Sequence, residues 1–244
     1  MKYFFLLLLT TTIVFSAFAQ TLSPFRDEVT KKWGYKDAGG KIVVPAQFYS
    51  ANKYSEGMAT VECHEIVDLL GSPMPQVRYG YLDATGNQVI PCQYINAADF
   101  SEELATVLSN AGHGFIDKKG NTVIPFNYSG AKSFSEGLAP VNKSGKWGYI
   151  DKKGNIVIPC TYDDASVFSE GLAAVNMGYV GWSYDDEEEA SGLWGYIDKT
   201  GKMVIPCTYS SANNFMSNGI AIVEDENGEA ILIDRTGKVD EGEE

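Results

Sequence analysis

Positive charge is scarce in this chain. Among its 244 residues, Lys and Arg number 19 and Asp and Glu number 32, which gives a formal net charge of −13. Proteins that bind nucleic acids or anionic lipids present a basic surface to the phosphate groups. The composition therefore excludes nucleic acid as the expected partner and favours a cationic, neutral or protein partner.

Long hydrophobic runs are also scarce, and the clearest one lies at the N-terminus. Lys2 precedes the apolar stretch Phe4–Val14, and Ala17-Phe18-Ala19 has the small-x-small pattern of a cleavage site. This order is typical of a secretory signal peptide, and the stretch is too short to predict a transmembrane helix. We expect residues 1–19 to be removed, no integral membrane segment after cleavage, and a periplasmic or extracellular location.

A repeat fills the remainder of the sequence. In the clearest copy, residues 146–151 read KWGYID, residues 156–159 read IVIP and residues 168–175 read FSEGLAAV. The first turn glycines of successive copies are separated by 46, 34, 34 and 47 residues; they are Gly40, Gly86, Gly120, Gly154 and Gly201. The basic unit is therefore 34 residues, with insertions in two copies. A fixed period of this length indicates stacked supersecondary units.

Three phrases carry a resemblance to a known family: Lys32-Trp33-Gly34-Tyr35, Trp147-Gly148-Tyr149-Ile150-Asp151 and Trp194-Gly195-Tyr196-Ile197-Asp198. They resemble the bacterial WG-repeat family, also called KWG repeats, over about residues 31–239. The resemblance implies an all-β repeat protein with a binding or scaffolding role, and it supplies no catalytic residues. Tyr79 and His113 replace the leading Trp and Glu103 replaces a turn Gly, so we expect copies two and three to be locally irregular.

Each unit contains three segments that predict short strands. Residues 147–151 alternate large and small side chains, residues 156–158 are β-branched, and residues 172–175 are apolar. The Asp-x-x-Gly phrase between the first two predicts a tight hairpin. We predict an all-β fold of five three-stranded units plus a partial sixth, arranged as an open hairpin array or solenoid. A closed propeller-like ring is the alternative.

The predicted domain organisation has four parts. A short N-terminal linker over 20–30 follows the signal peptide, the β-repeat domain spans 31–239, and an acidic tail covers 240–244. Repeats that bury their apolar faces only against neighbours behave as one elongated body, so we expect a single repeat domain.

Aromatic residues recur at two fixed offsets after the strand-ending Pro of each copy. They are Phe48, Tyr94, Tyr128, Tyr162 and Tyr209, followed by Tyr54, Phe100, Phe134, Phe168 and Phe215. We interpret them as anchors that pack each loop against the next unit, because each can bury a large apolar area. A ladder of ligand-binding aromatics is the alternative. The Gly of the leading triplet is interpreted as allowing close approach of a neighbouring backbone or ring.

Cysteine and histidine are few. Cys92, Cys160 and Cys207 share one position after the strand-ending Pro, where other copies have Ala46 and Phe126. We favour buried free thiols there, with a Cys160–Cys207 bridge as the alternative, and Cys63 as the odd thiol. Glu62-Cys63-His64-Glu65 is the only cluster of metal-ligand residue types. Adjacent residues of a strand point to opposite faces, and no second Cys/His pair lies nearby to complete a tetrahedral zinc site. We therefore expect no metal site and no cofactor.

Catalytic signatures are absent from the sequence. No Ser or Cys lies in a recognisable nucleophile motif, and His113 occupies the position of the repeated Trp. We therefore expect no enzymatic activity. An envelope hydrolase that uses carboxylates of the Ser-Glu-Gly phrases along one edge of the array is the alternative.

The two insertions are the candidates for specific function. They cover about residues 62–78 and 176–193 and share one corner of the repeat, and insertions at equivalent positions map to one face of an array. The second holds aromatic residues beside an acidic run, and its predicted binding residues are Tyr179, Trp182, Tyr184, Asp185, Asp186 and Glu187. A solvated acidic loop is the alternative. We expect an exported binding or scaffolding module of the cell envelope, with an envelope protein or glycan as partner.

Overall fold

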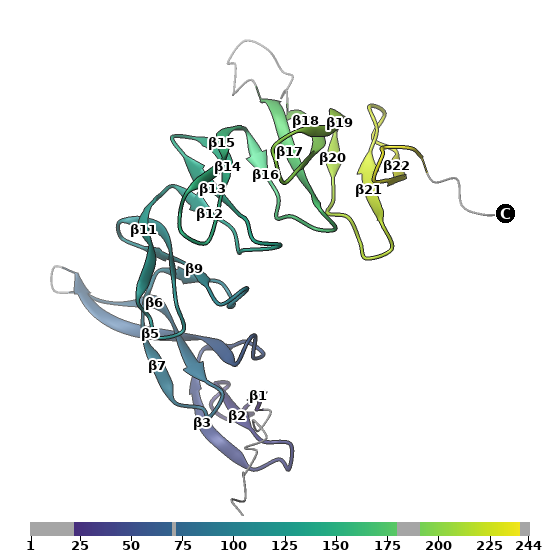
Figure 1. Ribbon diagram of the computed structural model, residues 1–244. Coiled ribbons are helices and arrows are strands. Elements are labelled where there is room, and N and C mark those ends of the chain that lie inside the picture. The colour runs from purple at the N-terminus through teal and green to yellow at the C-terminus, as the bar shows by residue number, and fades with distance from the viewer. Residues whose placement is uncertain (1–21, 70–71, 180–190, 240–244) are drawn as a thin grey trace, which may run out of the picture.

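The protein is an all-β array of six antiparallel sheets. The computed structural model describes residues 22–69, 72–179 and 191–239, and over these ranges the chain forms 22 strands and no helix. The sheets follow one another along an open arc, with the first and last at its two ends (Figure 1). The predicted all-β open repeat array is confirmed.

The strands fall into six sheets, numbered here in chain order. Sheet 1 contains β1 (Ser23–Arg26), β2 (Trp33–Lys36) and β3 (Ile42–Phe48). Sheet 2 contains β4 (Ser50–Ala51), β5 (Met58–Leu69), β6 (Ser72–Asp83) and β7 (Gln88–Tyr94). Sheet 3 contains β8 (Asn96–Ala97), β9 (Ala105–Ser109), β10 (Gly112–Ile116) and β11 (Thr122–Tyr128).

The remaining sheets follow the same plan. Sheet 4 contains β12 (Gly130–Ala131), β13 (Ala139–Lys143), β14 (Lys146–Ile150) and β15 (Ile156–Tyr162). Sheet 5 contains β16 (Asp164–Ala165), β17 (Leu172–Tyr179), β18 (Ser191–Asp198) and β19 (Met203–Tyr209). Sheet 6 contains β20 (Ser211–Ala212), β21 (Ile220–Glu224) and β22 (Ala230–Asp234).

The sheets are offset from the sequence repeat. One repeat supplies β14 and β15 to sheet 4, and then β16 and β17 to sheet 5. A strand of two residues, such as β16, gives sheets 2 to 5 a fourth strand that the predicted three-stranded units lack. Because every repeat contributes to two sheets, the covalent chain itself joins neighbouring sheets.

The predicted linker over 20–30 is wrong in part, because it contains β1. This strand pairs with β2 in antiparallel register from Ser23↔Lys36 to Arg26↔Trp33. The segment SPFR takes the place beside β2 that a strand of the preceding repeat takes in the later sheets. The described array therefore begins before residue 31.

The Asp-x-x-Gly phrases form the predicted turns. In the turn between β14 and β15, Asp151 Oδ1 accepts hydrogen bonds from the backbone N–H groups of Lys153 and Asn155, both at 2.9 Å. Gly154 has a φ of 83°, a left-handed conformation that glycine adopts without strain. The Asp residues at this position are therefore occupied by turn formation.

Copies two and three keep the regular geometry, contrary to expectation. Tyr79 pairs with Tyr94 and His113 with Tyr128, in the register that Trp147 and Tyr162 show in sheet 4. Glu103 holds a φ of 73° at a turn position where other copies have Gly. The surrounding hydrogen bonds therefore impose the turn despite the side chain.

The core lies between sheets. Phe168 of sheet 5 is fully buried and its ring centroid lies 4.9 Å from that of Tyr149 in sheet 4. The Tyr149 hydroxyl donates a 2.8 Å hydrogen bond to the Ser166 carbonyl oxygen. The same ring pair recurs as Tyr81–Phe100 and Tyr196–Phe215. These observations support the structural interpretation of the repeated aromatics.

The glycine of the leading triplet is required by a backbone contact. A Cβ added to Gly148 would lie 2.5 Å from the Ile158 carbonyl oxygen and 2.6 Å from the Cys160 amide nitrogen. These atoms belong to β15, where the register with β14 shifts through an irregularity. The neighbouring backbone therefore occupies the space of a side chain.

We predict that Gly148→Val destabilises the protein by about 1–3 kcal/mol or more, because backbone atoms cannot yield to the added side chain. Thermal melting measures the effect. Gly39→Thr is the matched control, since a Cβ there meets only Asp37 Oδ1 at 3.3 Å and other copies carry Thr at that position. Equal melting temperatures for the Gly148→Val variant and the parent protein would contradict the packing argument.

Candidate functional site

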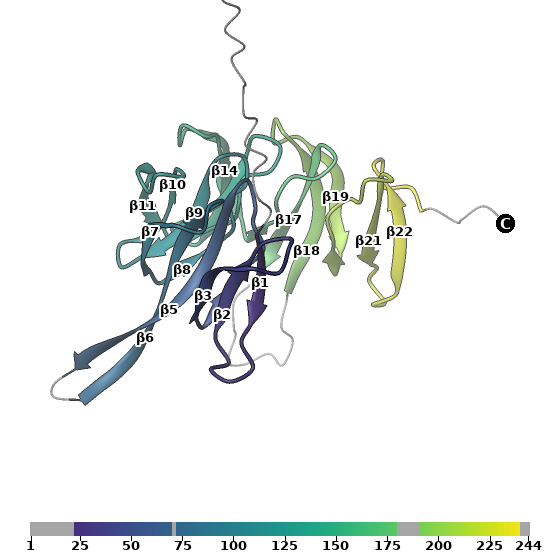
Figure 2. The ribbon, with the colours of Figure 1, turned by 90° about the horizontal axis from the view of Figure 1, so that it is seen from below.

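Both insertions lengthen the hairpin between the second and third strands of their sheets. β5 and β6 have 12 residues each and pair from Met58↔Asp83 to Leu69↔Ser72, whereas β9 and β10 have five each. Figure 2 shows β5 and β6 projecting from the arc. The predicted common corner is confirmed, but the first insertion forms a regular hairpin. We call its residues 64–77 the arm.

The arm presents apolar side chains to solvent. His64 pairs with Val77 and Ile66 with Pro75, so these four residues share one face, because alternate residues of paired strands point the same way. Ile66 is 67% exposed and Val77 is 39% exposed. On the opposite face, Met74 is 52% exposed. Exposed apolar patches of this kind mark interaction surfaces in soluble proteins.

Aromatic stacking fixes the root of the arm. The His64 ring stacks on Tyr49 with centroids 3.4 Å apart and planes 7° from parallel. Lys32 Nζ lies 4.6 Å from the centroid of the Tyr49 ring. His64 Nε2 is 2.9 Å from Glu62 Oε1, and the Tyr79 hydroxyl donates to Glu62 Oε2 at 3.3 Å. The apolar face of the arm therefore continues onto a rigid aromatic base.

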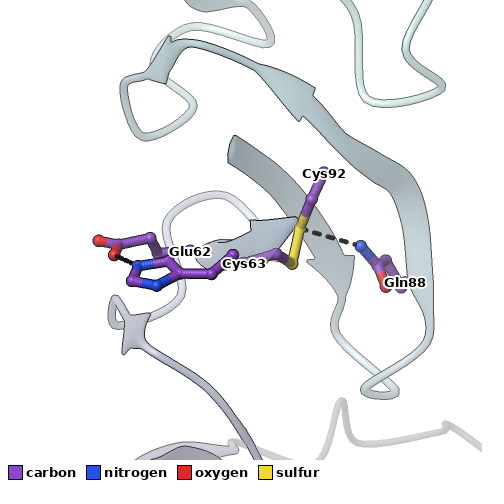
Figure 3. The surroundings of a disulfide bond; sticks show 5 residues. Glu62, Cys63, Gln88 and Cys92 are labelled. Carbon is purple, nitrogen blue, oxygen red and sulfur yellow. Dashed lines mark hydrogen bonds and ion pairs between the residues drawn. A yellow bond between two sulfur atoms is a disulfide. The ribbon is translucent and has the colours of Figure 1, made fainter. Parts of the chain in front are cut away.

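A disulfide joins the root of the arm to the outer strand of its sheet. Cys63 on β5 is bonded to Cys92 on β7, with Cα atoms 6.0 Å apart (Figure 3). β6 lies between these strands, and the β7 backbone crosses closely over Gly80, where a Cβ would lie 2.7 Å from the Cys92 amide nitrogen. The prediction of free thiols at Cys63 and Cys92 is wrong, because residues distant in the repeat pattern meet across this glycine.

The other two cysteines are half-buried free thiols. Cys160 Sγ contacts the Val141 carbonyl oxygen at 3.9 Å and Cys207 Sγ contacts that of Val175 at 3.8 Å, which shows that they cross their sheets as Cys92 does. The position of Cys63 is occupied by Lys143 in sheet 4. Free thiols are confirmed for this pair, and the alternative Cys160–Cys207 bridge is not formed.

We predict that reduction of the Cys63–Cys92 disulfide lowers stability by about 2–4 kcal/mol, because it releases a closed loop of the unfolded chain. The measurement is the melting temperature with and without dithiothreitol. Cys63→Ser should abolish the effect of the reductant, and Cys160→Ser should leave it intact. A parent protein insensitive to reductant would contradict the bond.

The tetrapeptide Glu62-Cys63-His64-Glu65, where no metal site was expected, lies on β5. Cys63 is bonded to Cys92 and is not available as a thiolate, and Glu62 accepts from both His64 and Tyr79. Over the described ranges, no group of three or more His, Cys, Asp and Glu side chains is placed to hold a metal ion. This cluster therefore serves the root of the arm.

The second insertion is described only at its ends. Tyr179 ends β17, and its backbone pairs with Ser191 of β18. The other predicted binding residues, Trp182, Tyr184, Asp185, Asp186 and Glu187, lie outside the described residues. Their role as an aromatic and acidic contact remains a prediction.

The Ser-Glu-Gly phrases link neighbouring sheets. Ser135 Oγ of sheet 4 donates to the Phe168 carbonyl oxygen of sheet 5 at 2.6 Å. Glu136 accepts from the Gly171 N–H at 3.1 Å and pairs with Lys199 at 2.9 Å. Glu102 does the same with Gly137 and Lys152. The carboxylates proposed for a hydrolase are therefore engaged in holding sheets together.

These contacts also determine ionisation. Partial burial opposes the charge of Glu136, but hydrogen bonds from Lys199 and from the Gly171 N–H outweigh it and lower the pKa below its ordinary value of 4.5. The pKa of Glu102 is lowered in the same way, by hydrogen bonds from Lys152 and from the Gly137 N–H. A general acid in a hydrolase needs a raised pKa, so these carboxylates do not match that role.

We predict a loss of stability in acid from these links. A carboxylate with a lowered folded-state pKa contributes stability above pH 4.5 that is lost as the pH falls through the folded value. Glu102→Gln should reduce stability at neutral pH by about 1 kcal/mol or less and reduce the further loss at about pH 3. Melting curves at both pH values test this, with the exposed Glu226→Gln as control. Identical acid sensitivity in the parent and in Glu102→Gln would contradict it.

Comparison with known proteins identifies the repeat. The profile of the family described as "WG containing repeat" matches residues 33–64, 79–111, 114–147, 147–179 and 194–228. The chain belongs to the WG-repeat family. The family segments omit residues 65–78 and 180–193, which are the two insertions. The arm is therefore an addition that this WG-repeat protein makes to the common unit.

Other comparisons are distant. No curated protein matches this chain. Among solved structures, BamB from Moraxella catarrhalis is 14% identical with a TM-score of 0.48, over 91% of this chain and 74% of BamB. The dihydro-heme d1 dehydrogenase NirN is also 14% identical, with a TM-score of 0.46 over 91% of this chain and 54% of NirN. No helix among the described residues has the length and apolar character to cross a membrane.

Proposed function

We propose that this WG-repeat protein is a non-enzymatic protein-binding module that acts outside the cytoplasm, with the arm as its principal contact. The observation that carries the proposal is the projection of a hairpin with exposed Ile66 and Val77 beyond the array. The repeated side chains elsewhere are committed to turns, to the core and to links between sheets. The arm carries exposed apolar groups that have no such structural use, and Ile66 at 67% is more exposed than Ile156 at 51% in an ordinary sheet.

The geometry of the arm suits a protein partner. β7 pairs with β6 only from Tyr79 to Leu82, and β4 pairs with β5 only at Val61 and Glu62. Beyond these residues, β5 and β6 pair only with each other. The outer edge of each strand therefore offers unpaired backbone hydrogen-bonding groups. An exposed strand edge can accept a strand from another chain. A two-stranded hairpin is also only marginally stable alone in water, so a partner that covers it would stabilise it.

The proposed location rests on two features. The Cys63–Cys92 disulfide is of the kind that persists in oxidising compartments. The N-terminal sequence has the order of a signal peptide. The aromatic and acidic residues from Tyr179 to Glu187 are proposed as a second contact, since they lie in the sequence between β17 and β18, where the arm lies between β5 and β6 in its own copy.

Site-specific photocrosslinking in cells tests the arm. A photoreactive amino acid at position 66 should capture a discrete protein, whereas the same residue at position 156 should not. Ile156 is the matched control because it is 51% exposed on β15, within an ordinary sheet. Capture of the same proteins from both positions would contradict an arm-specific contact.

Affinity for the captured partner provides the quantitative test. Ile66→Glu should weaken binding at least about tenfold, because it places a charge in an apolar contact, while the melting temperature stays within the small range typical of surface substitutions. Replacing residues 180–190 by a Gly/Ser linker tests the second contact separately. Unchanged affinity in both variants would contradict the proposed function.

A further inference from the structure

A cavity lies between sheets 3 and 4, away from the arm. Its volume is about 140 Å³, which is room for roughly four or five water molecules. Its lining comes from three strands of sheet 3, the segments beside them and one residue of β12; the residues are Asn96, Ala97, Ala98, Thr106, Leu108, His113 and Ala131. The cavity is partly open to solvent, so a small molecule can reach it.

The replacement of the repeated Trp by His113 accounts for this space. In sheet 4 the Trp147 indole crosses to β12, where its ring lies 3.0 Å from the position that a Cβ on Gly130 would take. The equivalent residue of β8 is Asn96, which lines the cavity together with His113. The smaller imidazole leaves unfilled the volume that an indole occupies in the next sheet.

Thr106 adds an unused hydrogen-bonding group to this cavity. Its side chain is only 7% exposed, and its buried hydroxyl has no hydrogen-bond partner among the described residues. The equivalent residue one sheet earlier, Thr60, donates to Asp99 Oδ1 at 2.7 Å. Buried hydroxyl groups are normally paired, so an unpaired one beside a cavity indicates a site that a ligand can complete.

The polar groups of the cavity are neutral. None of the described residues that line it is Asp, Glu, Lys or Arg, and burial lowers the pKa of His113 from its ordinary value of 6.5. A neutral imidazole offers one donor and one acceptor, and a carboxamide and a hydroxyl add further donors and acceptors. Ala98, Leu108 and Ala131 supply apolar walls. This combination has no charge to hold an ion and suits a ligand that carries several hydroxyl groups on a small carbon frame.

We propose that this cavity binds a neutral, hydroxyl-rich ligand, and that it accepts one edge of a single sugar unit through Asn96, Thr106 and His113. A free monosaccharide and the terminal unit of a glycan present the same chemistry. The inference does not depend on the arm, since the cavity lies on other strands.

The test uses the two histidines of the full mature chain. The ring NMR signals of His113 should shift when glucose, galactose, N-acetylglucosamine or its trimer is added, while those of His64 on the arm stay unchanged and serve as an internal reference. A response to the trimer but not to the monosaccharides assigns the ligand as a glycan end, and a response to a monosaccharide assigns a free sugar. No shift of His113 with any of the four would overturn the proposal.

Two substitutions separate binding from stability. His113→Trp restores the residue of the other copies and fills the cavity, and Thr106→Val removes the unpaired hydroxyl while keeping the shape. Because His113→Trp removes the NMR reporter, its binding is measured by calorimetric titration with the sugar that shifted the His113 signals in the parent protein. We expect each variant to weaken binding at least about tenfold and to have an equal or higher melting temperature. In sheet 5, Asp164 and Trp194 pair with Asn176 from its two sides, which shows that a side chain at the position of Asn96 tolerates an indole at the position of His113.

Thr60→Val is the matched control for Thr106→Val. It breaks the pair with Asp99 and should lower the melting temperature without affecting sugar binding. An equal loss of stability in Thr106→Val would show that the hydroxyl is already paired in the free protein and would overturn the proposal. Sugar binding unchanged in both cavity variants would overturn it as well.

Discussion

The array depends on one interaction, the burial of each sheet against the next. A single small sheet has no interior of its own, and repeat proteins solve this by stacking neighbours. Here the sheet 4 face that carries Tyr149 and Ile158 packs on the sheet 5 face that carries Phe168 and Val175. The Ser135 and Glu136 links cross the same junction. Because this junction recurs along the arc, a change within it affects two sheets at once.

The recurrence explains why much of the fold could be predicted from the sequence. Several features are local or appear in several copies, so the 34-residue period makes them recognisable in the sequence. They are the Asp151–Gly154 turn, the strand-ending Pro159 and the Tyr149–Phe168 pair. The two-residue strands such as β16 could not be predicted, because two residues carry no periodic pattern. The Cys63–Cys92 disulfide could not be predicted either, because it joins strands separated by β6 and depends on the β7 backbone crossing over Gly80.

The site was predicted less well than the fold for a related reason. The proposed binding surfaces lie where copies differ, and a difference has no periodic signal to define its structure. The first insertion has only prolines and apolar residues as clues, yet its 12-residue strands pair throughout. The sequence interpretation of His113 as a substitution within a structural position was reasonable, but it omitted the volume that a smaller side chain leaves behind. Comparing the size of each departure from the repeat with its neighbours in adjacent copies would have indicated the cavity.

Sheets 1 and 6, the first and last described sheets, differ in the residues on their outer faces. Lys36 of β2 occupies the position at which β14 and β18 carry the fully buried Ile150 and Ile197. A charge there opposes the packing of a further sheet, because it would have to leave water. The outer face of sheet 6 instead carries Ile222, which is 39% exposed, and Leu232, which is 42% exposed, beside the exposed Glu224. The outer face of sheet 1 therefore has a charge at the position of a buried Ile, whereas that of sheet 6 combines a carboxylate with exposed apolar side chains and lacks the Ser and Glu residues that complete an internal junction.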